Sequence, residues 1–470
     1  MKFANPLQRF KKCIILFSLG ISCSILSYLI YIIKPSQLIL EYNLEMRPDS
    51  LAFELWKKPP IQIYIKVYIF NITNMEEFLK GGVKLKVEEI GPYVYQEIVE
   101  NHNITWHENM ISYIPKRTII YVPEMSINDP KKDIIHVPNI PMLMYDEGEN
   151  VILMNIGKNK NMTEEEGRYL SIQSYNGSPG MSQWGYREED GNETYPENTI
   201  CNRIKGTTEG ELFPSYLDKH AVFRIFRKAF CKAIPIVFKK EVIMDNGLNG
   251  YLYSMSDDFL DTSEENPNNA CYCQKKKQCL KKGLSDITPC YYKIPAAMSL
   301  PHFLHADSSI YDNVEGLNPD SKKHTSQIII QPTIGIPMKI NSKIQINLVM
   351  QHTIYNSKIR PFNDMTIPLF WSDLVMDSLP NDLTFILKLI LQICPMVETV
   401  IIWLLAIAGT TMFVLSLLAI LWTINQQQEP LPSERRESCD LRIPLNYNQY
   451  TTIRILPNIK KIKSKSDLFS

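Results

Sequence analysis

Six cysteines are the residues of this chain whose type and spacing most clearly predict covalent chemistry. They fall within one stretch, at Cys201, Cys231, Cys271, Cys273, Cys279 and Cys290. An even cluster of this kind in an oxidising compartment predicts three disulfide bonds. The alternative in a reducing compartment is a zinc site, but the paired C-x-x-C spacing that favours zinc is missing.

Signatures of catalysis are absent from the sequence. It contains no G-x-S-x-G elbow, no H-E-x-x-H helix, no phosphate-binding G-x-x-x-x-G-K-[ST] loop and no G-x-G-x-x-G turn. His302, His305 and His324 are candidates for a metal group, but no paired carboxylates accompany them at ligand spacing. We interpret them as structural histidines, and we expect a protein that is not an enzyme and needs no metal or cofactor.

Sites of sugar attachment are also encoded. N-x-S/T sequons, the acceptors of N-linked glycans, occur at Asn71, Asn103, Asn161, Asn176 and Asn192. All five lie in the middle of the chain, as do the six clustered cysteines. Both kinds of modification predict that this middle part faces the cell exterior or an organelle lumen.

The composition is that of a folded protein without a charge bias. The chain has 470 residues, with 50 Lys+Arg against 50 Asp+Glu, so its formal net charge is zero. Hydrophobic residues make up 45% and charged residues 21%, which excludes wholesale disorder. No basic excess is available to neutralise phosphates, so nucleic acid is not an expected partner.

Two apolar runs, residues 13–33 and 399–424, contain no charged residue. As a helix, the first run rises about 31 Å, which matches a hydrocarbon layer of about 30 Å. Basic residues precede it and a mildly basic tail follows the second run, so both ends are predicted to be cytoplasmic. A cleaved signal peptide is the alternative for the first run, but no small-residue cleavage site follows it.

The two apolar runs divide the chain into five predicted parts. They are a cytoplasmic N-terminus (1–12), a first span (13–33), an extracellular or lumenal domain (34–398), a second span (399–424) and a cytoplasmic tail (425–470). Within the large domain, residues 62–69, 83–87 and 343–350 alternate apolar and polar side chains. Such alternation predicts strands of an antiparallel sheet with one buried face.

Two stretches of the large domain have helical spacing instead. In residues 220–232 the apolar side chains lie on one side, and the basic side carries Arg224, Arg227, Lys228 and Lys232. We interpret that basic side either as an acceptor for anionic lipid or lipoprotein or as an ordinary solvated face. Residues 383–394 also follow helical spacing until Pro395 interrupts it. This helix is expected either on the membrane surface or packed under the large domain.

The tail and the first span each carry one candidate signal. Residues Tyr450 to Ile453 fit the YxxΦ pattern that clathrin adaptors bind as an extended peptide. No acidic dileucine signal is evident, which favours the plasma membrane over the lysosome. Cys13, at the cytoplasmic edge of the first span, is a candidate for palmitoylation, and the alternative is an inert membrane cysteine.

Several short blocks of the large domain follow one another in a fixed order. The first is Gly91 to Glu97, GPYVYQE, and the others lie at Cys201–Pro214, Asn266–Cys273, Ser299–Leu304 and Gly316–Pro319. These blocks resemble those of the class B scavenger receptors, whose signature in the first block is GPYVYRE. That family includes a fatty-acid translocase, a lysosomal integral membrane protein and insect sensory neuron membrane proteins. The resemblance runs from the first span through the second.

The resemblance implies a fold and a disulfide pattern. The fold is an α+β ectodomain with an antiparallel, β-barrel-like core, helices and an apolar tunnel, anchored by two transmembrane helices. The implied pairs are Cys201 with Cys271, Cys231 with Cys290, and Cys273 with Cys279. One departure concerns the helical bundle at the membrane-distal apex, most of which is missing between Pro141 and Ser171. Its loss would remove the cationic surface that captures large anionic ligands.

The function implied by the resemblance is a receptor for lipids and lipoproteins. It would pass hydrophobic ligands such as fatty acids, sterol esters or carotenoids to the membrane. Alternatives within the family are a sensory co-receptor for lipid-like pheromones and a lysosomal receptor that transports lipid or an enzyme. A two-span ligand-gated channel is the alternative from another class, but the spans carry Ser and Thr rather than acidic residues.

Overall fold

The computed structural model describes residues 6–138, 150–157, 167–189, 193–273, 279–354, 356–357 and 359–427. The α-helices within them are α1 (Pro6–Ile33), α2 (Pro35–Leu44), α3 (Leu51–Lys57), α4 (Met75–Lys80), α5 (Ser321–His324), α6 (Asn381–Lys388) and α7 (Cys394–Gln427). The first seven strands are β1 (Ile63–Ile72), β2 (Leu85–Trp106), β3 (Met110–Tyr121), β4 (Ile152–Asn155), β5 (Ile172–Tyr175), β6 (Phe223–Arg227) and β7 (Lys232–Ile243). The other seven are β8 (Asn249–Met255), β9 (Ser285–Asp286), β10 (Ala296–Ser299), β11 (Val314–Glu315), β12 (Gln327–Ile330), β13 (Pro337–Val349) and β14 (Thr366–Met376).

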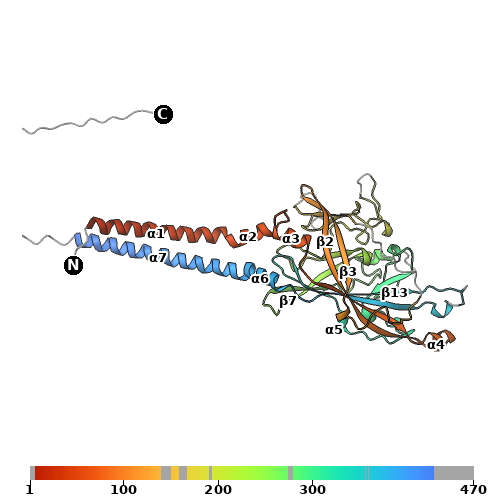
Figure 1. The fold of residues 1–470 in the computed structure, drawn as a ribbon. Coiled ribbons are helices and arrows are strands. Elements are labelled where there is room, and N and C mark those ends of the chain that lie inside the picture. The colour runs from red at the N-terminus through yellow and green to blue at the C-terminus, as the bar shows by residue number, and fades with distance from the viewer. Residues whose placement is uncertain are drawn as a thin grey trace, which may run out of the picture. The chain divides into compact units, whose positions relative to one another are not determined.

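A single sheet organises the large domain (Figure 1). Its strand order is β5-β4-β3-β2-β1-β14-β13-β12-β8-β7-β6, with β9, β10 and β11 attached at the side. The paired strands are antiparallel apart from β11, which runs parallel to β2. The predicted strands 62–69, 83–87 and 343–350 fall in β1, at the start of β2 and in β13. The antiparallel sheet predicted from their alternation is therefore confirmed.

The two outer strands of this order, β5 and β6, are joined by residues 206–208. Ile172 of β5 exchanges backbone hydrogen bonds with this segment, accepting from Gly206 (2.9 Å) and donating to Thr207 (2.7 Å). On the other side, Thr208 donates to Arg224 O and accepts from the N–H of Phe226, both at 2.9 Å. Because the segment pairs with both edges, it satisfies edge groups that an open sheet exposes, and the sheet becomes barrel-like.

The predicted helix over residues 220–232 is wrong. These residues form β6, a 3₁₀ turn (Lys228–Phe230) and the first residue of β7. The reason is that both faces of β6 are covered, since Phe223 packs in one core cluster and Phe226 in another. Apolar residues in a strand buried on both faces do not alternate, and here their spacing resembles that of a helix.

The second predicted helix exists, but Pro395 does not interrupt it. A π-helical turn (Leu389–Ile393) joins α6 to α7 without a gap, and Pro395 is the second residue of α7. The wider π turn accommodates the proline, which lacks an N–H, within a continuous helix. Leu383 and Leu387 are buried against the ectodomain in a cluster with Met376 and Leu379. Gln392 donates a side-chain hydrogen bond to Gly247 O at 2.9 Å. Of the two placements expected for this helix, the structure shows the one packed under the ectodomain.

Two apolar helices are long enough to cross a membrane, Phe10–Leu44 and Asn381–Asn425. Of the described residues, 6–23 and 408–427 belong to one compact unit, and the described residues between 24 and 407 belong to the other. Within the first unit α1 and α7 are in close contact. A Cβ on Gly20 would lie 3.0 Å from Gly409 O, and Ser416 Oγ donates to Cys13 O at 3.0 Å. Small residues at the contact let the two backbones approach closely, as is typical of membrane helix pairs.

The region in which the resemblance predicts a shortened apex is only partly described. Residues 139–149 and 158–166 lie outside the described part of the chain. Between Val122 and Val222, the described residues contain β4, β5 and two short 3₁₀ turns, and no α-helix among them. This is the stretch in which the sequence predicts that most of the helical bundle is missing.

Candidate functional site

The first apolar cavity lies beneath the juxtamembrane helices. It has a volume of about 40 Å³ and is lined mainly by aliphatic side chains of α2, α3 and the α6–π segment. Leu40 and Leu44 come from α2, Leu55 from α3, and Leu387 and Leu391 from the C-terminal segment. The i, i+4 spacing of each leucine pair puts both members on one helix face, so the helices turn their apolar sides toward the cavity. We call it the juxtamembrane cavity.

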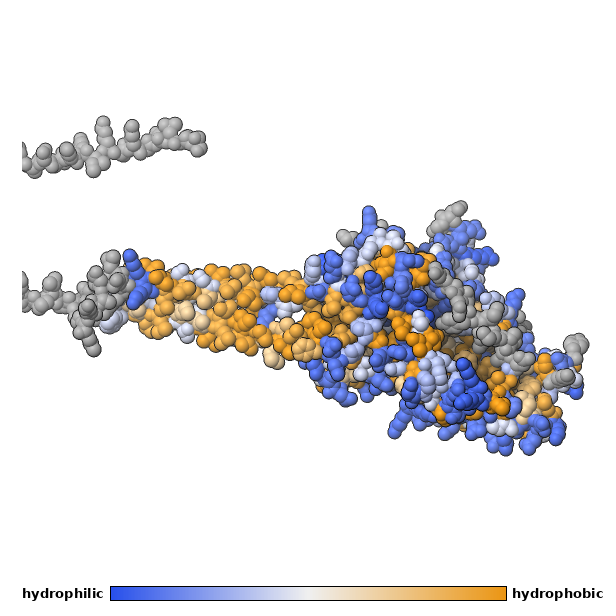
Figure 2. Space-filling model, viewed as in Figure 1, coloured by the Kyte–Doolittle hydropathy of each residue, from blue (hydrophilic) through white to orange (hydrophobic). Residues whose placement is uncertain are grey.

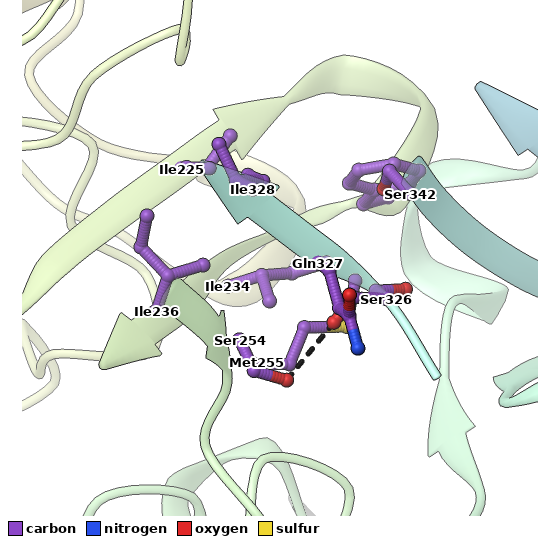
Figure 3. Close-up of a pocket in the computed structure, with 10 residues that line it drawn as sticks. Ile225, Ile234, Ile236, Ser254, Met255, Ser326, Gln327, Ile328 and Ser342 are labelled. Carbon is purple, nitrogen blue, oxygen red and sulfur yellow. Dashed lines mark hydrogen bonds between the residues drawn. The ribbon is translucent and has the colours of Figure 1, made fainter. Parts of the chain in front are cut away.

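A second apolar cavity, of about 30 Å³, lies against the sheet (Figure 3). Its walls are Ile225 of β6, Ile234 and Ile236 of β7, Met255 of β8 and Ile328 of β12. Its polar rim includes Ser254, whose hydroxyl donates to Ser326 O at 2.9 Å. We call it the sheet cavity. The two cavities have interiors that suit hydrocarbon, because each offers aliphatic surface and few polar groups.

Residues 209–213 lie between the two cavities. Leu212 and Phe213 line the juxtamembrane cavity. Gly210, with φ +81°, lies against Ile225, a wall of the sheet cavity, so that an added Cβ would come within 3.3 Å of the Ile225 side chain. A positive φ and this close approach both favour glycine at the position.

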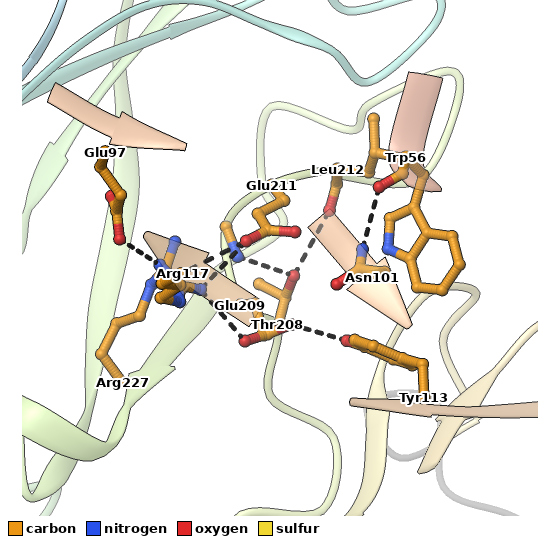
Figure 4. Close-up of polar contacts among 11 residues, drawn as sticks. Trp56, Glu97, Asn101, Tyr113, Arg117, Thr208, Glu209, Glu211, Leu212 and Arg227 are labelled. Atoms are coloured by element: carbon orange, nitrogen blue, oxygen red, sulfur yellow. Dashed lines mark hydrogen bonds and ion pairs between the residues drawn. The ribbon is translucent and has the colours of Figure 1, made fainter. Parts of the chain in front are cut away.

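Glu209 and Glu211 of this segment belong to a polar cluster (Figure 4). Arg117 of β3 contacts three carboxylates, Glu211 at 3.0 Å, Glu97 at 3.1 Å and Glu209 at 3.4 Å. Tyr113 donates a hydrogen bond to Glu209 at 2.6 Å, and Arg227 of β6 lies 3.8 Å from Glu211. The charged side chains keep only 7% to 22% of their surface exposed. The cluster is therefore largely buried.

Burial and the proximity of these charged groups shift the pKa values of several of them. Burial, and then the charge of Glu209, raises the pKa of Glu211 to about 8, although Arg117 opposes the shift. Burial alone would lower the pKa of Arg117, but Glu211, Glu209 and Glu97 raise it above its ordinary value. Burial, followed by the charges of Glu209 and Glu211, raises the pKa of Tyr113 well above its ordinary value. The raised pKa favours the neutral form of the Glu211 carboxyl.

The four basic residues predicted as an anionic-ligand face do not share a face. Arg224 is buried and donates to Ile200 O at 3.1 Å, and Arg227 belongs to the polar cluster. Lys232 is fully buried, donates to Ser285 Oγ at 2.8 Å and lies 4.0 Å from the centre of the Tyr272 ring. Burial lowers the pKa of Lys232 to about 7. Only Lys228 of these four is exposed, so the interpretation as a basic ligand surface is wrong. Arg224 and Arg227 lie on opposite faces of β6, and Lys232 is on the next strand, β7.

The clustered cysteines form three disulfides, Cys201–Cys271, Cys231–Cys290 and Cys273–Cys279. These are the pairs that the family resemblance implies. The first two cross-link segments 70 and 59 residues apart and border the core that contains Trp184, whose indole N–H donates to Cys231 O at 2.7 Å. Cys13, the candidate for palmitoylation, is a free, half-buried cysteine of α1.

The three histidines do not come together as a metal group. His302 donates from Nε2 to Glu89 at 2.6 Å, since its Nδ1 accepts from the backbone N–H of Asn318. His324 stacks on His302 with ring centres 4.6 Å apart, and its Nδ1 accepts from the N–H of Asp320. His305 is exposed. Their contacts are those of side chains that support loops beside β14.

The glycosylation sequons differ in exposure. Asn103 and Asn176 are exposed, whereas Asn71 is half-buried and accepts a hydrogen bond from the backbone N–H of His136 at 2.8 Å. Asn161 and Asn192, like Tyr450 and Ile453 of the tail motif, lie outside the described residues.

We expect Asn103→Gln and Asn176→Gln each to remove one glycan, because an exposed sequon in a lumenal domain is open to the transferase. Each variant should migrate faster than the parent protein on a denaturing gel. After enzymatic deglycosylation the variants and the parent should migrate together. Unchanged mobility of both variants before deglycosylation would contradict the assigned side of the membrane.

The polar cluster was not predicted from the sequence. The available signal is a polar residue at an inward position of an alternating strand. In β2, Glu97, Val99 and Asn101 all face inward and are buried, and Arg117 is the residue of β3 directly opposite Val99. The segment with Glu209 and Glu211 has no regular structure, so no periodicity indicates where its side chains point.

Comparison with known proteins agrees with the fold. The model of the CD36 family matches residues 13–170 and 153–420. Lysosome membrane protein 2 of Homo sapiens is 27% identical over 365 residues, which cover 66% of this chain and 74% of the relative. Scavenger receptor class B member 1 of Rattus norvegicus is 25% identical over 411 residues, and that of Cricetulus griseus is 26% identical over 410; in both cases the match covers 75% of this chain and 78% of the relative.

These matches confirm the resemblance inferred from the sequence blocks. An antiparallel barrel-like sheet, three ectodomain disulfides and two apolar helices long enough to span a membrane agree with it. The chain belongs to the CD36 family.

Proposed function

We propose that this protein is a scavenger-type membrane receptor that binds lipids or lipoproteins and passes hydrophobic ligands between its ectodomain and the bilayer. The observation that carries the proposal is the juxtamembrane cavity, whose aliphatic walls are supplied by the same helices that continue into the two apolar spans. A ligand leaving this cavity remains beside apolar helix surface. Burying hydrocarbon stabilises it by about 25 cal/mol per Å², so such a route avoids the cost of exposing an acyl chain to water.

The apolar helices are longer than a bilayer requires. Phe10–Leu44 has 35 residues and Asn381–Asn425 has 45, about 50 Å and 70 Å of helix against a hydrocarbon layer of about 30 Å. The excess includes α2 and α6, whose outward side chains Leu38, Ile39 and Phe385 are 52%, 64% and 62% exposed. Apolar side chains cover the visible surface of these helices (Figure 2). Exposed apolar groups next to the cavity suit contact with lipid headgroups and acyl chains.

The sheet cavity and residues 209–213 extend the proposed route into the barrel. In this proposal the two cavities are parts of one tunnel, with the polar cluster between them. Transfer along such a path needs binding surface but no nucleophile, which agrees with the absence of enzyme motifs from the sequence. Fatty acids, sterol esters and carotenoids are the ligand classes to test.

The membrane in which the protein acts is part of the proposal. We place the protein in the plasma membrane, which the relatives named scavenger receptors support. Both termini are placed in the cytoplasm because basic residues flank the two apolar runs. The match to lysosome membrane protein 2 supports the second candidate, a lysosomal receptor for lipid or an enzyme. Residues Tyr450 to Ile453 of the tail fit the pattern that clathrin adaptors bind. Binding of an adaptor there would carry the protein from the plasma membrane to the lysosome by endocytosis.

Filling the juxtamembrane cavity is expected to block transfer. Ala52 of α3 lines this cavity, so phenylalanine at that position would occupy the space of a ligand. Cells that express the parent protein should take up a fluorescent fatty acid, sterol ester or carotenoid faster than mock cells. Ala52→Phe should lose most of that increase.

The matched control is Glu54→Phe, which adds the same side chain on the exposed side of α3. It should leave uptake unchanged at equal surface expression, which antibody labelling of intact cells measures. Uptake equal to that of mock cells for all three lipid classes would refute the proposed function.

A further inference from the structure

Residues 316–324 lie against β2 and β14 and bury little of their own surface. Among these residues, all of which the structure describes, His324 alone is buried and Leu317 is half-buried. Leu317 packs against the apolar cluster that contains Phe70 and Trp371. A segment with so little buried surface opens at a low cost in free energy. Individual hydrogen bonds therefore decide whether it stays in place.

Two backbone N–H groups of this segment donate to histidine rings. The N–H of Asn318 donates to Nδ1 of His302 at 3.1 Å, and the N–H of Asp320 donates to Nδ1 of His324 at 3.0 Å. A ring nitrogen that accepts a hydrogen bond carries no proton, so both histidines are neutral here and hold their proton on Nε2. In His302 this Nε2 donates to Glu89 at 2.6 Å, whereas in His324 it lacks a hydrogen bond.

Protonation of a ring removes the acceptor that its backbone N–H group uses. A histidine cation donates from both ring nitrogens, so its Nδ1 would face a backbone N–H that also donates. The lost bond is costly, because His302 and His324 are only 4% and 1% exposed. The two rings stack with centres 4.6 Å apart, so a charge on one also repels a charge on the other. The closed segment therefore requires neutral histidines.

The carboxylate beside the rings does not change its charge in the same pH range. Burial alone would raise the pKa of Glu89, but hydrogen bonds from His302 and Trp371 lower it to about 2. A change of charge at mildly acidic pH consequently comes from the rings rather than from Glu89. The other ionisable groups near the rings are Asp320 and Lys323 of the segment, Tyr311 of the preceding loop, Tyr68 of β1, Lys343 of β13 and Asp373 of β14.

We propose that His302 and His324 form a pH-sensitive switch that holds residues 316–324 against the sheet at neutral pH and releases them in an acidic compartment. Release uncovers the side chains behind the segment, among them Glu89 and Trp371. A receptor that moves from the cell surface to a lysosome meets such a fall in pH, so its ectodomain would present a different surface in each place. The switch goes beyond the proposed function and does not depend on lipid transfer.

The direction and size of the pH effect follow from the closed and open states. Burial, and then the charge of His302, lowers the pKa of His324 to about 4 in the closed segment. In the open segment this ring has the ordinary histidine pKa of about 6.5. The closed state is therefore most stable above pH 6.5 and loses stability as the pH falls toward 4. Between pH 7.4 and pH 5, His324 by itself should increase the open population about 25-fold.

Hydrogen exchange of the full chain in nanodiscs at pH 7.4 and pH 5 tests the switch. After correction for the intrinsic pH dependence of exchange, the amides of Asn318 and Asp320 should lose protection about 25-fold at pH 5, while those of β13 keep theirs. His324→Asn cannot ionise but keeps an acceptor, because its Oδ1 can accept from the N–H of Asp320. This variant and His302→Asn should each reduce the loss, and the double variant should abolish it.

The matched control is His352→Asn. His352 is an exposed histidine outside the segment, with Nδ1 3.0 Å from Asp364, so its replacement should leave the pH course of residues 316–324 unchanged. Equal protection of Asn318 and Asp320 at both pH values in the parent protein overturns the proposal, and so does an undiminished loss in the double variant. The measurement contains no transported ligand, so either of these results leaves the uptake experiment and the proposed function standing.

Discussion

Replacing Arg117 with methionine is expected to lower the free energy of unfolding by about 3–5 kcal/mol, the cost of leaving buried charges without their partner. Arg117 is the group that lies within 3.4 Å of all three carboxylates of the cluster, Glu97, Glu209 and Glu211. Without it Glu97 and Glu209 face each other's charge where water has little access. The effect is measured as the decrease in the midpoint temperature of thermal unfolding of the full chain in detergent, relative to the parent protein.

Lys116→Met is the matched control for this prediction. Lys116 is the neighbouring residue of β3, on the exposed face, so its loss removes the same charge but no buried contact. It should change the midpoint little, since exposed ion pairs contribute about 0–1 kcal/mol. Adding Glu97→Gln to Arg117→Met should restore part of the stability, because one uncompensated charge is then removed as well. A stable Arg117→Met protein would show that the buried ion pairs of Arg117 do not stabilise the fold as expected.

Removal of the Cys231–Cys290 disulfide is expected to have an effect of similar size. The bond joins residues 59 apart in the chain, and a loop of that length loses about 4 kcal/mol of unfolded-state entropy on closure. Both cysteines should be replaced by alanine, so that no free thiol remains. We expect the double variant to unfold at a lower temperature than the parent and to reach the cell surface in smaller amounts.

The Cys273–Cys279 disulfide provides a control with identical chemistry. It joins residues only 6 apart, for which the same relation gives about 2 kcal/mol, half the value for the longer loop. The double alanine variant at these positions should therefore be clearly more stable than the one at Cys231 and Cys290. Equal destabilisation by the two variants would mean that the constraint on the unfolded chain does not determine the contribution of these bonds.

Much of the membrane anchor and of the sheet could be predicted from local patterns. The runs 13–33 and 399–424 fall within α1 and α7, and the alternating stretches 62–69 and 343–350 fall within β1 and β13. Both patterns depend on one kind of environment along the whole element. A membrane helix is apolar all round, and a half-buried strand alternates, so the sequence alone shows them.

Elements with mixed surroundings were mispredicted. Residues 220–232 form strands because Phe223 and Phe226 pack against different cores, an arrangement that depends on neighbours far away in the sequence. Pro395 leaves the helix intact because a π-helical turn precedes it and the ectodomain holds α6 in place through Leu383 and Leu387. In both cases tertiary contacts override the local preference.

The candidate site depends on tertiary structure still more strongly. Arg117 contacts Glu97 because β2 and β3 pair in one register. It contacts Glu209 and Glu211 because residues 206–208, just before them, pair with β5 and β6 and close the barrel. A shift of one residue in the β2–β3 register would turn Glu97 and Asn101 outward. No spacing in the sequence predicts these contacts, since each contributing segment has the pattern of an ordinary strand or loop.

The sequence by itself therefore determined the two apolar helices, the disulfide-forming cysteine cluster and the family, because hydropathy, cysteine clustering and short blocks are local properties of the chain. Only the tertiary structure decided that Lys232 is buried rather than displayed, that α6 lines a cavity with α2 and α3, and that Arg117 contacts three carboxylates from separate segments. The physical reason is that burial, pKa shifts and ligand space arise from groups brought together by folding, and their free energies depend on distances that the chain order does not contain.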